Sequence, residues 1–310
     1  MIRIMCIGLL AGLFFSTTFI LNRAMSLEGG HWFWSASLRY GYMFILLLIG
    51  LWCTQGSRYM KNVIQEFTTN WRFWILCGSI GFGGFYSLIC FAADFAPGWV
   101  VATTWQLTII ASLVVLMLFG RSFSPKIGFF SLVVFCGVFL VNLSQMQNVG
   151  IVTLLLGALP VLGAAFCYPM GNQLVWEAQN GHNKLPKINR ELLSNTFTKV
   201  LLLTLGSLPF WTILFIVMRP APPSGGQLLS VALVALFSGV IATTLFLNAR
   251  HQAKNASELA AVDATQASEV IFALGGEVFF LGAALPNLIG IIGILITGIG
   301  LLAFAYHDHG

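Results

Sequence analysis

Charged side chains are scarce in this chain. Asp, Glu, Lys and Arg make up 8% of its 310 residues, against about 25% in an average soluble domain. So few charges cannot cover a soluble fold of this length, which excludes a cytosolic globular enzyme. The hydrophobic share of 58% and the mean hydropathy of +0.88 exclude a disordered chain. The composition therefore indicates a polytopic membrane protein.

Several chemical motifs are also absent from the sequence. The six cysteines lie in or beside apolar segments without the spacing of metal ligands, so we expect them to be packing residues. No glycine-rich phosphate loop stands between a strand and a helix, which argues against ATP-driven transport. The five histidines form no cluster with a nucleophile. We therefore expect no enzyme, no metal and no cofactor.

Ten apolar runs are long enough to cross a membrane, because a span needs about 20 residues at 1.5 Å each. They lie at residues 4–24, 31–53, 73–93, 98–119, 127–145, 149–175, 197–218, 228–249, 258–281 and 287–306, with longer connections at 54–72 and 176–196. The first run is read as an uncleaved helix. A signal peptide is the alternative, but the run lacks a small-residue cleavage site. The sequence predicts an all-α protein with ten transmembrane helices.

Lys and Arg in the connections predict the orientation, since cytoplasmic loops carry an excess of both. If the N-terminus is cytoplasmic, the outer segments hold only Arg23 and Arg219. The inner segments and their edges then hold Arg3, Arg58, Lys61, Arg72, Arg121, Lys126, Lys184, Lys187, Arg190, Lys199, Arg250 and Lys254. We expect a cytoplasmic-membrane protein with both termini inside. The net charge of +5 follows from this bias and indicates no nucleic-acid partner.

The two halves of the chain share weak sequence matches. Ala102-Thr103 and Ala264-Thr265, Gly120 and Gly282, and Gly128 and Gly290 are all separated by the same number of residues. These matches predict a duplication, with residues 1–147 and 148–310 as five-helix repeats. Because five is odd, the second repeat enters the membrane from the opposite side, an arrangement used by many transporters. Chance recurrence of small residues in a helix bundle is the alternative.

Several segments resemble a known group of membrane proteins. They are Leu38-Arg39-Tyr40, Phe91-Ala92-Ala93, the stretch from Pro97 to Thr108 and the run Ile289-Gly290-Ile291-Ile292-Gly293. With the two five-helix halves, they resemble the ten-helix type of the drug/metabolite transporter superfamily, in the branch of multidrug resistance efflux and EamA-like transporters. The resemblance implies efflux of small amphipathic drugs or metabolites by alternating access. It also implies a central cavity, with helices five and ten at the periphery.

The sequence departs from that superfamily in its first helix. The four-helix drug exporters carry a proton-exchanging glutamate there, whereas this chain has Ser16, Thr17 and Thr18 in the first span and Cys167 and Tyr168 in the sixth. A proton mechanism is therefore not carried over from that motif.

Charged residues inside spans are costly and should face protein or water. These residues are Arg39, Asp263, Glu269 and Glu277. On an ideal helix the three acidic residues and Gln266 fall within an arc of about 120°, which indicates either a substrate pathway or a structural contact. Arg39 lies about 12 Å from the outer end of its span, and Glu269 lies at a similar depth. They could form a permanent ion pair, or Arg39 could make an anion or gating contact. Glu269 is the most central carboxyl group and our candidate for proton coupling.

Four uncharged residues complete the predicted pathway. Trp105 and Gln106 could form a wall for substrates, including cationic ones. Asn22 and Asn172 occupy matching places in the two halves, where they could bind backbone groups freed by loosened helices. Pro160, Pro169 and Pro209 each remove a helix hydrogen bond in spans six and seven, which predicts either breaks that suit a transporter or ordinary kinks.

The leading interpretation is a secondary transporter that exports small organic molecules, with lipid around it. An amino-acid or other metabolite permease without proton coupling is the alternative, and a non-transporting scaffold or sensor is a weaker one. Glycines of the last span could mediate a homodimer.

Overall fold

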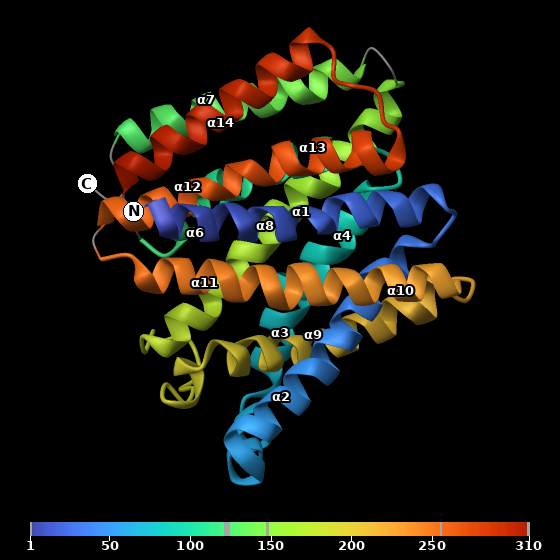
Figure 1. Cartoon of the computed structure of the whole chain (residues 1–310). Coiled ribbons are helices and arrows are strands. Elements are labelled where there is room, and N and C mark those ends of the chain that lie inside the picture. The colour runs from blue at the N-terminus through green and yellow to red at the C-terminus, as the bar shows by residue number, and fades with distance from the viewer. Residues whose placement is uncertain (1, 121–124, 147–148, 255, 309–310) are drawn as a thin grey trace.

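The computed structural model describes residues 2–120, 125–146, 149–254 and 256–308. Within these ranges every regular element is a helix, and each of the ten predicted spans corresponds to one helical segment (Figure 1). Six segments are single helices: α1 (Ile2–Leu27), α2 (Trp32–Thr69), α7 (Pro125–Met146), α8 (Ile151–Gln179), α9 (Thr196–Met218) and α14 (Leu288–Asp308). The prediction of an all-α membrane protein is confirmed.

In the other four spans the helix changes type or is interrupted partway along the span. Span three is α3 (Trp71–Gly78), η1 (Ser79–Gly84) and α4 (Phe85–Ala92), and span four is α5 (Gly98–Trp105) and α6 (Thr108–Leu118). Span eight is α10 (Gly225–Val234), η3 (Ala235–Ala242) and α11 (Thr243–Gln252), and span nine is α12 (Ala256–Ala264), η4 (Thr265–Ala267) and α13 (Ser268–Leu281). A short 3₁₀ helix, η2 (Leu192–Ser194), lies between α8 and α9.

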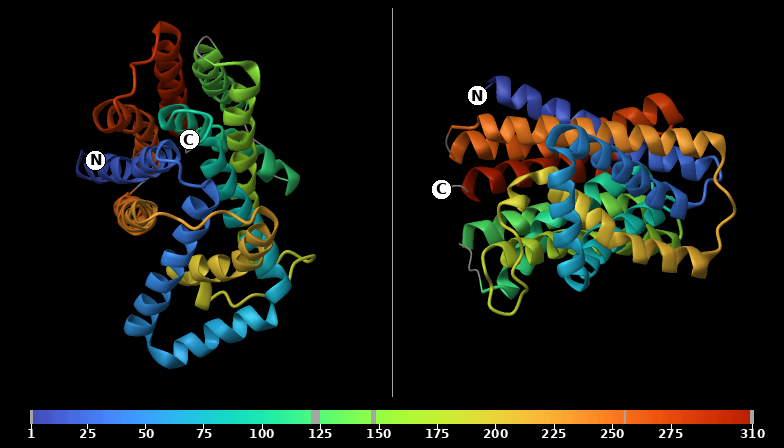
Figure 2. Two further views of the ribbon diagram at one scale, coloured as in Figure 1. Left: turned by 90° about the vertical axis from the view of Figure 1, so that its right-hand side faces the viewer. Right: turned by 90° about the horizontal axis from the view of Figure 1, so that it is seen from below.

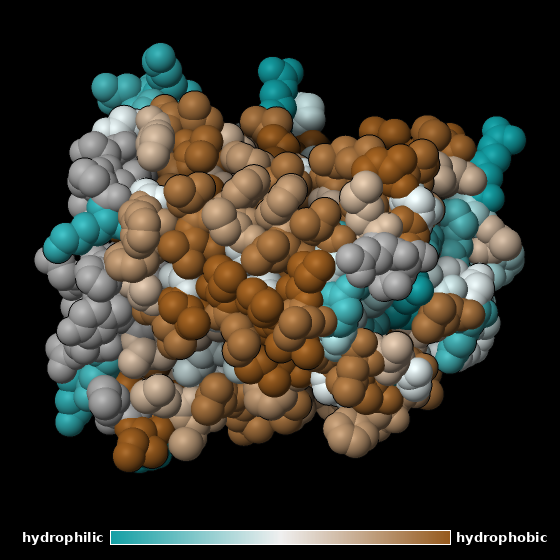
Figure 3. Space-filling model, turned by 90° about the horizontal axis from the view of Figure 1, so that it is seen from above, coloured by the Kyte–Doolittle hydropathy of each residue, from teal (hydrophilic) through white to brown (hydrophobic). Residues whose placement is uncertain are grey.

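The molecule has the surface of a membrane protein. Eight helical stretches are long and apolar enough to span a bilayer, and the described part of α14 adds a shorter apolar one. Figure 3 shows a broad hydrophobic face with hydrophilic residues mostly toward its left and right ends and some along its upper edge. Both chain ends lie at one of these ends, here called the terminal face (Figures 1 and 2). The chain is a multi-pass membrane protein.

The fifth and tenth spans form a pair at one edge of the bundle. Helices α7 and α14 pack along each other and make smaller contacts with α12, α5 and α8 (Figures 1 and 2). Gly137 and Gly293 allow this approach, because a side chain at either position would overlap the backbone of the other helix. The remaining spans pack around α1, α2, α8 and α9.

The predicted connection at 54–72 is helical instead. Helix α2 bends at Gly56, whose φ of 80° falls in the left-handed region that glycine tolerates. Beyond the bend, Met60, Val63 and Glu66 are buried on one face while their neighbours are exposed. This arm lies at the edge of the molecule opposite α7 and α14 (Figure 2). The apolar residues of this arm recur with helical period, and this pattern predicts a helix although charged residues lie between them.

None of the three prolines breaks its helix. Helix α8 continues through Pro160 and Pro169, and α9 continues through Pro209. Pro169 has no N–H to donate to the carbonyl of Ala165, and the Thr108 hydroxyl donates to that oxygen instead, at 3.3 Å. A neighbouring helix thus replaces the hydrogen bond that proline removes.

The irregular segments instead fall in spans three, four, eight and nine. Spans three and eight each contain a π-helical stretch, η1 and η3. In span four a turn at Gln106-Leu107 separates α5 from α6, and span nine has 3₁₀ geometry at η4. Such irregular stretches in long helices are frequent at functional sites, because they redirect side chains and free backbone groups.

Candidate substrate site

Arg39 lies within α2 and reaches two other spans. Its Nη2 donates to the Ser238 hydroxyl of η3 at 3.3 Å, and its guanidinium carbon lies 4.2 Å from the centre of the Tyr86 ring in α4. A cation over an aromatic face is attracted to the negative ring face. The pair with Glu269 that depth suggested is not formed, because no ion pair joins Arg39 to an acidic side chain in the described ranges.

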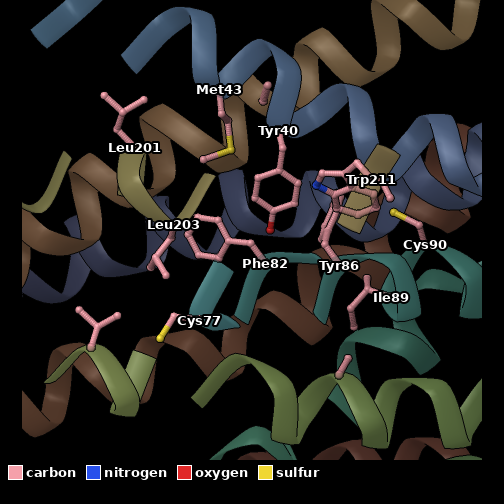
Figure 4. Packing of buried hydrophobic residues seen from close by; sticks show 14 of the residues in the cluster. Tyr40, Met43, Cys77, Phe82, Tyr86, Ile89, Cys90, Leu201, Leu203 and Trp211 are labelled. Carbon is pink, nitrogen blue, oxygen red and sulfur yellow. The ribbon is translucent and has the colours of Figure 1, made fainter. Parts of the chain in front are cut away.

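Tyr40 follows Arg39 and packs into a cluster of aromatic rings. Its ring stacks on Phe82 of η1 and Trp211 of α9, with centroid distances of 5.1 and 5.7 Å, and meets Tyr86 edge-on. Figure 4 shows Tyr40 among Phe82, Trp211 and Tyr86. Two successive residues of α2 thus contact both π-helical stretches, Tyr40 through Phe82 and Arg39 through Ser238.

Several buried polar atoms near Tyr86 lack a hydrogen-bond partner. The Asn22 amide donates to the Tyr86 hydroxyl at 3.2 Å, so it bridges α1 and α4. Its Oδ1 has no partner, and neither does the Nε of Arg39. One turn before Asn22, the Thr18 hydroxyl is also unpaired. Buried polar groups are nearly always satisfied, so this cluster needs an explanation.

Asn22 and Asn172 do not bind backbone groups freed by loosened helices, as the sequence suggested. Helix α1 continues past Asn22 to Leu27, and α8 continues past Asn172 to Gln179. Neither helix loosens there. Asn172 donates to the Tyr168 carbonyl of its own helix at 2.9 Å.

Three aromatic rings from different helices form a second cluster. Trp105 of α5 lies 4.9 Å from Phe85 of α4 and 5.8 Å from Tyr168 of α8, and Phe85 lies 5.0 Å from Tyr168. Phe85 also contacts Tyr86, which joins this cluster to Arg39. The position of Trp105 fits an aromatic wall.

Gln106 does not extend this wall. Its side chain is buried and donates to the Ala102 carbonyl of its own span at 3.3 Å.

The polar arc predicted for span nine is divided among separate contacts. Asp263 forms an ion pair with Arg250 of α11 at 2.8 Å, and both side chains are partly exposed. Glu277 is buried at the other end of the span and accepts hydrogen bonds from the N–H groups of Gly98, at 2.7 Å, and Trp99, at 3.1 Å. These are unpaired donors at the start of α5, so Glu277 caps a helix on another span.

Replacing Glu277 by glutamine should destabilise the protein by about 1–3 kcal/mol, because two hydrogen bonds to a buried carboxylate are weakened or lost. The apparent unfolding temperature of detergent-solubilised protein measures this change. Glu191→Gln is the control, because Glu191 is exposed in the connection between α8 and α9. An equal stability of both variants would contradict the capping role.

Gln266 and Glu269 remain from the predicted arc. Glu269 is 6% exposed in the first turn of α13, and Gln266 lies partly exposed in η4. No hydrogen bond or ion pair of either side chain is found in the described part of the chain. Tyr168 lies within electrostatic range of both Glu269 and Arg39. Glu269 is therefore a buried carboxyl group whose charge acts on Tyr168 of the aromatic cluster.

The residues missed at the sequence level are Tyr86, Tyr168, Phe85 and Ser238. Apart from Ser238, they are aromatic residues within apolar runs, and composition does not distinguish a ring facing the interior from one facing lipid. Among the described residues, no three His, Cys, Asp or Glu side chains lie where they could hold an ion.

Comparison with known proteins identifies the family. A family model described as "EmrE: Putative multidrug resistance efflux transporter" matches residues 2–309. The chain is 39% identical over 319 residues to "Uncharacterized protein YjlA" of Bacillus subtilis (strain 168), covering 96% of this chain and 94% of that protein. It is 35% identical to "Uncharacterized 42.1 kDa protein in intracellular alkaline protease 3'region" of Shouchella clausii, covering 80% of this chain and 64% of that protein.

The fold also has a counterpart among solved structures. A chain described only as "Crystal structure of protein" aligns over 99% of this chain and 98% of its own length, with a TM-score of 0.61 and 15% identity. At that identity the likeness concerns the fold alone. The family model matches nearly the whole length of the chain and therefore identifies its family. The chain belongs to the EmrE family of multidrug resistance efflux transporters in the drug/metabolite transporter superfamily, a family of transporters and not of enzymes.

Proposed function

We propose that this protein is a secondary transporter that exports small organic molecules by alternating access. The observation that carries the proposal is the group of polar and aromatic side chains around Arg39, Tyr86 and Glu269. These side chains come from spans of both halves and lie within the membrane. Embedded ionisable residues without a structural partner commonly mark a substrate or ion pathway.

The helix contacts support two related halves. The first span packs on the eighth and ninth, and the sixth packs on the third and fourth. The second span packs on the eighth, and the seventh packs on the third. The second and seventh spans also pack on each other, as do the fifth and tenth. Exchanging the halves maps these contacts onto one another. The π-helical stretches in spans three and eight obey the same exchange.

Residues 1–147 and 148–310 are therefore proposed to be inverted repeats that rock against each other. In such transporters a central site is exposed to each side of the membrane in turn. Arg39 and Tyr40 contact both π-helical stretches, so a shift of one half relative to the other would change their surroundings. This arrangement couples the candidate site to the proposed motion.

The terminal face is proposed to be cytoplasmic, because the connections on that side hold nearly all Lys and Arg. Reporter fusions after Lys126 and after Arg190 should both report a cytoplasmic location. An outer location for either fusion would contradict the orientation and the inverted arrangement of the halves.

Labelling tests the proposed pathway directly. In a variant whose six cysteines are replaced by alanine, a cysteine at Gln266 should react with a polar, membrane-impermeant thiol reagent, and substrate should slow the reaction. A cysteine at Ala273, fully buried in the same span, should stay inert. If Gln266→Cys is as unreactive as Ala273→Cys, this part of span nine is a packing surface and does not line the pathway.

A further inference from the structure

The guanidinium group of Arg39 is a cation without an anion. Its contacts are the Ser238 hydroxyl and the Tyr86 ring, and no carboxylate of the described residues pairs with it. Arginine stays charged in proteins, so its charge cannot be removed by loss of a proton. A positive charge at this depth is costly unless it is compensated.

Polar atoms without hydrogen-bond partners lie around the uncompensated charge of Arg39. Arg39 Nε is a buried donor without an acceptor. Asn22, whose amide donates to the Tyr86 hydroxyl, has an unpaired Oδ1, and Thr18 Oγ1 in the same helix is also unpaired. Asn22 is 3% exposed, so bulk solvent does not satisfy its oxygen. A ligand that accepts from Arg39 and donates to Asn22 would satisfy groups that the protein leaves unsatisfied.

We infer that Arg39 binds an anionic group of the transported molecule, and that the substrates are amphipathic organic anions; this inference rests on the proposed transport function. A planar guanidinium group binds carboxylates and phosphates through paired hydrogen bonds. Ser238 and the Tyr86 ring hold the guanidinium in place from two spans.

The aromatic cluster provides the surface for the apolar part of such a molecule. Phe85 contacts Tyr86 beside Arg39 and continues to Trp105 and Tyr168. These side chains form a continuous row of rings that starts at the charge. An anion with an aromatic or other flat apolar body would contact both parts of the site at once.

A cationic substrate fits this end of the site poorly. It would meet the like charge of Arg39, and the face of Tyr86 that would attract a cation already carries the guanidinium group. Glu269 acts electrostatically on Tyr168, as Arg39 does. A positive group on the substrate would therefore have to lie away from Arg39.

Binding of three probes that share one ring tests the inference: naphthylacetate, naphthylethanol and naphthylethylammonium. Calorimetry on purified protein should give naphthylacetate an affinity at least about tenfold higher than that of naphthylethanol. Arg39→Gln should remove this preference while naphthylethanol still binds, which also reports an intact fold. Arg39→Lys should keep part of it, and Arg72→Gln, which removes an exposed arginine, should leave it unchanged.

The inference is overturned if wild-type protein binds naphthylethanol or naphthylethylammonium at least as tightly as naphthylacetate, if naphthylacetate does not bind, or if Arg39→Gln keeps the preference. Exchange of a neutral compound across vesicle membranes by the wild type would then still support transport, so the two proposals can fail separately.

Discussion

Replacing Glu269 by glutamine is expected to abolish accumulation of substrate driven by a pH gradient, while exchange of substrate across the membrane continues. Glu269 is buried, and no polar partner holds it among the described residues. Such a carboxyl group can take up a proton in one state and release it in another as its surroundings change. Glutamine keeps the shape but cannot exchange a proton. Uptake into proteoliposomes with and without a pH gradient measures the effect.

Glu177→Gln is the matched control for this prediction. Glu177 is similarly buried, but it accepts a hydrogen bond from Gln173 of its own helix at 2.9 Å near the end of α8. Its replacement should leave pH-driven uptake unchanged. If Glu269→Gln accumulates substrate like the wild type, Glu269 is not the coupling residue, and transport without proton coupling becomes the better description.

Replacing Gly206 by valine should prevent stable assembly of the bundle. A side chain at Gly206 of α9 would overlap the Trp74 carbonyl of α3, and one at Gly78 would overlap the Leu203 carbonyl of α9. The two backbones are therefore in contact and cannot separate without loss of packing around them. We expect a destabilisation of about 3 kcal/mol or more, seen as loss of monodisperse protein and a lower unfolding temperature.

Gly41→Val is the control for Gly206→Val. Gly41 lies in α2, and a side chain there would meet open space. This variant should behave like the wild type. Equal stability of the two variants would mean that α3 and α9 can move apart more easily than their backbone contact implies.

The spans were predictable because membrane insertion selects for long apolar runs, a property of local composition. Each predicted span overlaps one helical segment, and its ends differ by a few residues, apart from the arm of α2 beyond Gly56. The π-helical stretches were not predictable in this way. The segment η1 is rich in glycine, and η3 reads as an ordinary apolar helix, so no shared sequence pattern marks the two stretches. Their geometry depends on packing against other spans.

The candidate site was predictable only in part. Arg39 and Glu269 were identified because a charge inside a span is costly wherever it points. Their pairing was wrong, because depth in the membrane does not reveal which way a side chain faces. The arc of span nine assumed one ideal helix, whereas η4 changes the helical phase between Asp263 and Glu269. The capping role of Glu277 fits the structural contact that the sequence left open, but its partners, the free N–H groups of α5, depend on where a distant helix begins.

Exchange flux in sealed proteoliposomes tests the central claim most directly. Purified protein, without ATP, should exchange a labelled small organic compound across the membrane with saturable kinetics, and unlabelled compound should compete. The account predicts flux well above that of protein-free vesicles for some members of a panel of organic anions, dyes, amino acids and nucleosides. Flux equal to protein-free vesicles for every member would contradict it.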